Sequence, residues 1–142
     1  MLRPLMTALA LITLTGGAAF AEDFEVKMLN KDGDDRMVFA PDFLKIAAGD
    51  TVHFIPTDKG HNAESIKGMA PEGSAPFKGK IGKQVDVTFD TDGFYGVECK
   101  PHFAMGMVMT IAVGDVAAPD DFLAGRIPPK AKARFETQLG NL

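Results

Sequence analysis

The sequence has 142 residues, which is ordinary for one globular domain and short for two. Its formal net charge of −4 argues against nucleic acid as a partner, because neutralising phosphates requires a basic surface. Hydrophobic residues make up 46% of the chain and charged residues 24%, which is typical of a packed protein and excludes a disordered one.

The first 21 residues predict a cleaved secretory signal. A basic residue, Arg3, precedes an apolar run from Leu5 to Leu14, and the segment ends in the small-residue triplet Ala19-Phe20-Ala21. The apolar run is too short to span a bilayer, and Gly16-Gly17 interrupts its continuation, which argues against a membrane anchor. We expect cleavage after Ala21, so that residues 22–142 form a single mature domain without membrane attachment.

Short runs of alternating apolar and polar residues occupy the chain between residues 24 and 113. Period-two alternation over short runs, interrupted by turns rich in Gly and Asp, predicts an all-β fold built as an antiparallel sandwich. The runs lie at residues 24–28, 52–54, 85–89, 95–99 and 107–113, and the turns at 31–33, 48–50 and 91–93.

A short helical extension is expected over residues 119–140. Pro119-Asp120-Asp121 predicts one or two helical turns, and Pro128-Pro129 precedes a predicted helix over residues 130–139. Apolar residues recur there at helical spacing and Gly140 marks the end, so we expect an amphipathic helix packed on the sandwich. The apolar stripe consists of Ala131, Phe135 and Leu139.

The chain has a single cysteine, Cys99, and so cannot form an internal disulfide. A lone thiol can be buried and inert or form an intermolecular disulfide, but the neighbours of Cys99 favour a metal ligand. His102 and Met107 follow within nine residues, and soft sulfur with imidazole suits copper that cycles between Cu(I) and Cu(II). The alternation also predicts that Cys99 and Met107 point into the sandwich.

A trigonal copper site needs a second imidazole, which only His53 or His61 can supply. His53 is opposite in parity to Val52 and Phe54, so its side chain is expected to face solvent. His61 follows Gly60 at the end of a strand, where a side chain can reach a neighbouring edge. The pattern favours His61 over His53 as the second imidazole ligand, but it excludes neither histidine.

Other kinds of site fit less well. A structural zinc centre usually takes more cysteines or a closed set of four Cys and His ligands. A Cys-His nucleophile would need an oxyanion donor and a substrate cleft, and neither is evident. A copper enzyme would need a second metal with further histidines, so we expect no enzyme. The alternative to an electron carrier is a copper delivery or storage protein, which usually has exposed Met- or Cys-rich sites.

His61-Asn62, followed by Cys99-x₂-His102-x₄-Met107, resembles the type 1 (blue) copper motif of the cupredoxins. The spacing is similar to that of plastocyanins and pseudoazurins, and residues 54–62 with the helical tail resemble the pseudoazurin family. The resemblance covers the whole mature chain and implies an eight-stranded Greek-key sandwich. It further implies one type 1 copper with His61 and His102 bound through ring nitrogens, Cys99 through its thiolate and Met107 as a weak axial ligand. Asn62 would tie the loop of the first histidine to the Cys99 loop.

The same resemblance implies a periplasmic electron-transfer protein of denitrification. Its acceptor would be a nitrite reductase, and its donor a c-type cytochrome or similar protein. Electrons would pass through the ring edge of His102, within an apolar patch that includes Pro56, Pro101 and Met105. A carrier that exposes one docking face is expected to be a monomer.

The resemblance also implies a ring of lysines around that patch, which would dock an acidic partner. Lys31, Lys59 and Lys78 match the usual positions of this ring. Glu98 departs from the pattern, because it stands where a lysine is common, while Lys100 adds a positive charge two residues later.

Overall fold

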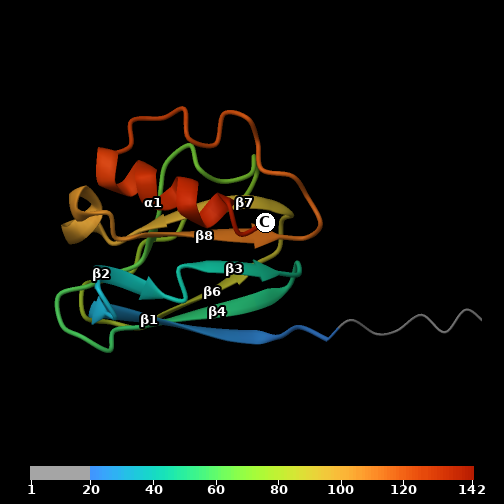
Figure 1. Cartoon of the computed structure of the whole chain (residues 1–142). Helices are drawn as coiled ribbons and strands as arrows, with labels where there is room; N and C mark the ends of the chain where they lie inside the picture. The colour runs from blue at the N-terminus through green and yellow to red at the C-terminus, as the bar shows by residue number, and fades with distance from the viewer. Residues whose placement is uncertain (1–19) are drawn as a thin grey trace, which may run out of the picture.

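The computed structural model describes residues 20–142, which form two four-stranded sheets packed face to face (Figure 1). The first sheet has the order β2-β1-β4-β6 and the second β3-β8-β7-β5. Their bounds are β1 Asp23–Asp32, β2 Asp35–Ala40, β3 Phe43–Ile46, β4 Asp50–Ile55, β5 Glu64–Ser65, β6 Val85–Phe89, β7 Gly93–Glu98 and β8 Val108–Val113. The predicted sandwich of eight strands is confirmed.

The sheets are mixed rather than purely antiparallel. Strand β1 pairs with β4 in parallel, and β3 pairs with β8 in parallel, whereas the remaining pairs are antiparallel. The sequence-based expectation of an antiparallel sandwich was wrong for these two pairs. The chain crosses from one sheet to the other between β2 and β3 and again between β3 and β4, which brings distant strands side by side in the same direction.

Two hydrophobic cores lie on opposite faces of the sheet that contains β7 and β8. Odd-numbered residues of these strands face the first core, between the sheets, with Val26, Phe54 and Phe89 of the other sheet. Even-numbered residues such as Val108 and Ala112 pack into the second core, against Phe122, Ala131 and Phe135 of the C-terminal tail. Every residue of β8 is therefore buried, and the predicted inward parity of this strand is confirmed.

The tail covers the outer face of the second sheet with one helix, α1 (Pro129–Leu139), seen above β7 and β8 in Figure 1. The predicted helix is confirmed and ends at Leu139, with Gly140 as its C-cap, as expected. Ala131 and Phe135 of the predicted stripe are fully buried and Leu139 is partly buried against the same core, while Gln138 is an additional buried residue that the stripe did not include. Residues 120–123 form turns instead of the expected helical turns.

The predicted signal segment, residues 1–21, lies outside the described residues except for its last two positions. Within residues 20–142, no helix combines the length and the apolar character needed to cross a bilayer.

Candidate metal centre

The candidate site is built around the connection between β7 and β8. Cys99 follows the last residue of β7, and Met107 precedes the first residue of β8. Between them, a short 3₁₀ segment, η1 (Lys100–Met105), turns the chain back, and Gly106 closes it in the left-handed conformation at φ 90°. Because only glycine adopts this conformation at little cost, the segment can return to the sheet within one residue.

Backbone hydrogen bonds hold this segment in a compact form. The Cys99 N–H donates to the Met107 carbonyl at 3.0 Å, so the two sulfur-bearing residues are neighbours across the loop. The His102 N–H donates to the Cys99 carbonyl at 3.0 Å, and the Met107 N–H donates to the His102 carbonyl at 3.1 Å. The three residues that the sequence motif selects are thus linked to one another through the main chain.

His61 comes to this segment from the connection between β4 and β5. Its Nδ1 atom lies 3.6 Å from the Cys99 sulfur and 3.1 Å from Nδ1 of His102. Nδ1 of His102 lies 3.4 Å from the same sulfur. One sulfur and two imidazole nitrogens therefore converge on one point, and Met107 is fully buried in the same core as Cys99.

These three residues fit a small soft metal ion. Ligand atoms at about 2.0–2.3 Å from a metal in one plane lie roughly 3.5–3.9 Å apart, close to the observed separations. A thiolate and two neutral imidazoles form the trigonal set that blue-copper centres use. Copper bound there supplies a one-electron change between Cu(I) and Cu(II).

Asn30 fixes the orientation of the His61 ring. Nε2 of His61 donates to the Asn30 side-chain oxygen at 2.9 Å, so the ring proton resides on Nε2 and the lone pair of Nδ1 faces Cys99. The Asn30 N–H in turn donates to the Asp58 carboxylate at 2.7 Å. Sequence reasoning missed Asn30, because it lies 31 residues before His61 and belongs to no local motif.

Asn62 joins the two loops, as the resemblance implied. Its side-chain oxygen accepts a hydrogen bond from the Lys100 N–H at 2.8 Å, and its amide donates to Glu64 and to the Gly79 carbonyl. Asn62 is 2% exposed, so these bonds are shielded from water. The expected link between the first-histidine loop and the Cys99 loop is confirmed.

Burial shifts the proton affinities of the converging groups. Burial lowers the pKa of His61 below 6.5, and the nearby His102 lowers it further. Burial also raises the pKa of the Cys99 thiol, while the N–H groups of Asn62 and His102 act in the opposite direction. The imidazole of His61 is thus neutral and ready to bind, whereas the thiol needs a cation to lose its proton at neutral pH.

The two histidines differ in their access to the surface. His61 is fully buried, whereas His102 is half-buried between exposed Pro101 and the exposed end of η1. Met105 of that segment is 45% exposed, and Pro56 is half-buried. The ring of His102 is therefore the part of the cluster that approaches solvent.

Glu98, the predicted departure from a basic ring, lies inside the protein. Glu98 is 4% exposed, and one of its carboxylate oxygens accepts a hydrogen bond from Lys100 Nζ at 3.2 Å. Its other oxygen, Oε2, is buried and has no hydrogen-bond partner among the described residues. Burial raises the pKa of Glu98 despite the opposing hydrogen bond and charge of Lys100, and the cross-strand neighbour Glu64 adds to the increase. Glu98 therefore adds little negative charge to the surface, although it pairs with the charge of Lys100.

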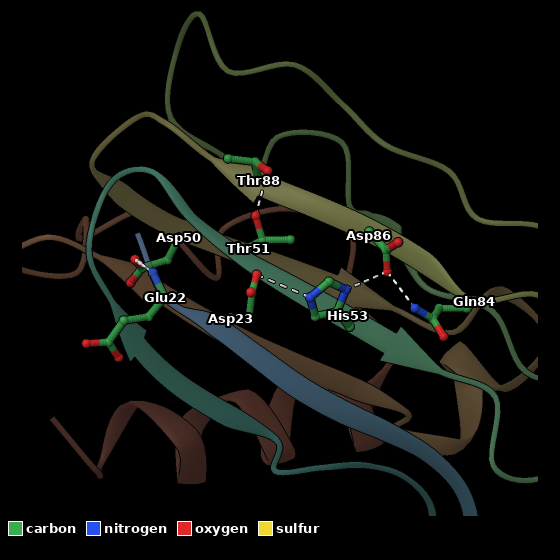
Figure 2. A network of polar contacts seen from close by, with 8 residues as sticks. All are labelled: Glu22, Asp23, Asp50, Thr51, His53, Gln84, Asp86 and Thr88. Carbon is green, nitrogen blue, oxygen red and sulfur yellow. Dashed lines mark hydrogen bonds and ion pairs between the residues drawn. The ribbon is translucent and has the colours of Figure 1, made fainter. Parts of the chain in front are cut away.

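His53 lies apart from the cluster, on the outer face of the first sheet (Figure 2). Its Nδ1 atom lies 2.7 Å from the Asp86 carboxylate and Nε2 lies 3.3 Å from Asp23. Gln84 also donates to Asp86, as Figure 2 shows. The predicted outward direction of His53 is confirmed by these partners.

Comparison with known proteins agrees with this geometry. Residues 25–114 match the family model of copper-binding proteins of the plastocyanin/azurin family. The chain is 44% identical over 139 residues to a putative pseudoazurin of Rhizobium leguminosarum bv. viciae, with 97% of this chain and 91% of that relative covered. It is 42% identical over 141 residues to the pseudoazurin of Paracoccus pantotrophus, with 97% and 96% covered.

Solved structures give the same relationship. The crystal structure of the native pseudoazurin from Hyphomicrobium denitrificans superposes with a TM-score of 0.80 at 41% identity, with 84% of this chain and 98% of that chain covered. The pseudoazurin of Methylobacterium extorquens AM1 gives a TM-score of 0.78 at 38% identity, with 84% and 98% covered. The chain belongs to the plastocyanin/azurin family of copper-binding proteins and, within it, to the pseudoazurins, which makes it a cupredoxin that carries electrons on copper.

Proposed function

We propose that this chain is a periplasmic electron carrier, and not an enzyme, that holds one copper on His61, Cys99, His102 and Met107. The observation that carries the proposal is the convergence of two Nδ1 atoms and one sulfur within 3.6 Å of one another. Met107 completes the set as the axial ligand, because it is buried beside Cys99 and joined to it by a backbone hydrogen bond.

The surrounding residues keep this site nearly unchanged during the electron transfer. His61 is held by Asn30, and the two loops are joined by Asn62. Groups fixed by packing and hydrogen bonds need little rearrangement when charge changes, so the barrier to electron transfer stays low. His61, Cys99 and Met107 are fully buried, which keeps water away from the part of the site that they line.

The exposed lysines lie at the same end of the molecule as the cluster. Lys31 is adjacent to Asn30, which binds His61, and Lys59 lies two residues before His61. Lys100 follows Cys99 directly, and Lys78 adjoins Gly79, whose carbonyl binds Asn62. A local basic surface on an acidic chain steers an acidic partner to the ring of His102.

The resemblance to pseudoazurins supports a nitrite reductase as acceptor and a c-type cytochrome or similar protein as donor. The predicted signal segment, with cleavage after Ala21, supports export to the periplasm. A monomer suits a carrier that exposes one docking surface to successive partners.

The decisive experiment is copper loading of the purified mature chain. Bound Cu(II) is expected to give an intense visible thiolate-to-copper absorption band, and Cys99→Ser is expected to abolish it. His53→Gln serves as the matched histidine control and should leave the band unchanged, whereas His61→Gln should abolish or strongly shift it. A colourless copper complex would contradict the proposal, and a coloured protein that fails to reduce a nitrite reductase would contradict only the acceptor. Release of copper to an acceptor protein would favour copper delivery instead.

A further inference from the structure

The main chain of Met107 is tied within its own loop. Its N–H donates to the His102 carbonyl at 3.1 Å, and its carbonyl accepts from the Cys99 N–H at 3.0 Å. These two bonds fix Met107 relative to the other members of the cluster. Asn62 ties the Lys100 end of the loop to the first-histidine loop, but these bonds leave open what holds the Met107 end against the rest of the protein.

Two side chains of α1 supply that connection. The guanidinium of Arg134 donates to the Gly106 carbonyl at 2.7 Å. The amide of Gln138 donates to the Val108 carbonyl at 3.0 Å. Gly106 and Val108 are the residues immediately before and after Met107, so the carbonyl groups of both neighbours of the axial residue are held by one helix. Arg134 and Gln138 are four residues apart and therefore share one face of that helix.

Both side chains are held in turn by other parts of the fold. Gln138 is 1% exposed, accepts from the Thr110 hydroxyl at 2.8 Å and donates to the Asp42 carboxylate at 3.1 Å. Arg134 also donates to the Met37 carbonyl at 2.9 Å. Because each donor has at least two partners on different elements, neither can move without loss of a second bond.

The helix backbone also touches the loop at Gly106. A Cβ atom added there would lie 3.1 Å from the Lys130 carbonyl oxygen, tighter than an ordinary contact. The lack of a side chain at Gly106 therefore allows both the left-handed turn and the close approach of α1. The helix rests on the residue next to Met107 through main chain as well as side chains.

We propose that α1, through Arg134 and Gln138, positions Met107 and thereby sets the strength of its axial contact with copper. The proposal rests on the function proposed above. The family model matches residues 25–114, and α1 lies beyond that segment. The hydrogen bonds from α1 are therefore an addition to the domain that the family shares. A long and weak axial contact is soft, so small displacements of Met107 change the electronic character of the site and its reduction potential.

The test is a double-mutant cycle that links Arg134 to Met107. The readouts are the relative intensities of the visible thiolate-to-copper bands and the reduction potential. Arg134→Met removes the donors while retaining much of the apolar stem, and it is expected to shift both readouts. Lys132→Met is the control, because it makes the same charge change at an exposed position of the same helix, and it should leave both unchanged.

The cycle is completed in a Met107→Leu background, which has no axial sulfur. If Arg134 acts through Met107, Arg134→Met causes no further spectral change there. An equal shift in both backgrounds, or a folded Arg134→Met protein with unchanged bands and potential, would overturn the proposal. If Arg134→Met fails to fold, Arg134→Lys replaces it, since this change keeps the charge and loses the forked geometry. A wild-type protein without any thiolate-to-copper band would instead refute the function on which the proposal rests.

Discussion

Asn30 accepts a hydrogen bond from Nε2 of His61 at 2.9 Å and thereby decides which nitrogen of that ring faces Cys99. Partners of this kind orient a ligand before the metal arrives, and their removal typically lowers metal affinity about 10-fold to 100-fold. We expect Asn30→Ala to weaken copper binding about tenfold, measured by competition with a chelator. Asn141→Ala changes an exposed asparagine near the C-terminus and is the control. Equal affinities for Asn30→Ala and wild type would show that the ring is oriented by packing alone.

Lys59→Glu is expected to slow electron transfer to a nitrite reductase about tenfold at low ionic strength. The exposed Lys59 lies two residues from His61, and its reversal places a negative charge at the docking surface. Salt screens such charges over about 10 Å at 0.1 M, so the effect should shrink as salt is added. Stopped-flow rates at several salt concentrations check this. Lys45→Glu makes the same change beside Asp115, at the end of β8 that is distant from Met107, and an equal slowing there would contradict local steering.

Glu98→Gln is expected to stabilise the copper-free protein above the pKa of Glu98. Burial raises that pKa above 4.5, so the folded state prefers the protonated acid. The favourable contribution of Glu98 to the free energy of unfolding is complete below pH 4.5, and it is lost as the pH rises through the folded-state pKa. The melting temperature of the variant relative to wild type should therefore increase from pH 4 to pH 8. Glu136→Gln, at an exposed position of α1, should show no such trend.

His53 should make the stability of the protein depend on pH in the same direction as Glu98, but beginning at a higher pH. The hydrogen bond to Asp86 raises the pKa of His53 above 6.5, with Asp23 adding to the shift (Figure 2). A raised pKa gives a contribution that is complete below pH 6.5 and is lost as the pH rises through the folded-state value. Denaturant unfolding of wild type should show this loss, and His53→Gln should flatten it. Asp86→Asn, which removes the first partner, should reduce it.

Removal of the predicted signal segment should strengthen one contact at the start of β1. The backbone nitrogen of Glu22 lies 2.8 Å from the Asp50 carboxylate, which is 4% exposed and also accepts from the Ala47 N–H (Figure 2). Cleavage after Ala21 turns that nitrogen into a charged ammonium group. We expect a free N-terminus to be about 1 kcal/mol more stable than an acetylated one in denaturant unfolding. Asp50→Asn should remove the difference, and a difference that persists would assign the effect to another group.

The parts of this structure that could be predicted depend on residues that are close together in the sequence. Period-two alternation located five of the strands, and the nine residues from Cys99 to Met107 carried most of the site. The parity argument placed Met107 and Ile111 toward the core between the sheets, which the structure confirms. The helix of the tail was also readable, because its apolar spacing and its terminal glycine lie within eleven residues.

The parts that escaped prediction depend on contacts between distant segments. Asn30 meets His61 only because β1 lies beside β4, and nothing near Asn30 in the sequence marks it. Strands β2, β3 and β5 are short or lack a clear alternation. Gln138 escaped because a polar residue on a helix normally faces water, whereas here it satisfies the Val108 carbonyl.

The unequal exposure of the two imidazoles limits how this protein can meet its partners. His61 is sealed inside the protein, and His102 alone of the cluster approaches the surface. With His102 as the electron route, as proposed above, donor and acceptor would occupy the same patch, one after the other, and would exclude each other while bound. Such a protein would not connect two partners in a standing complex. The overall rate of electron transfer from donor to acceptor would depend on how quickly the protein dissociates from the donor. Docking that is too tight would therefore slow the overall transfer.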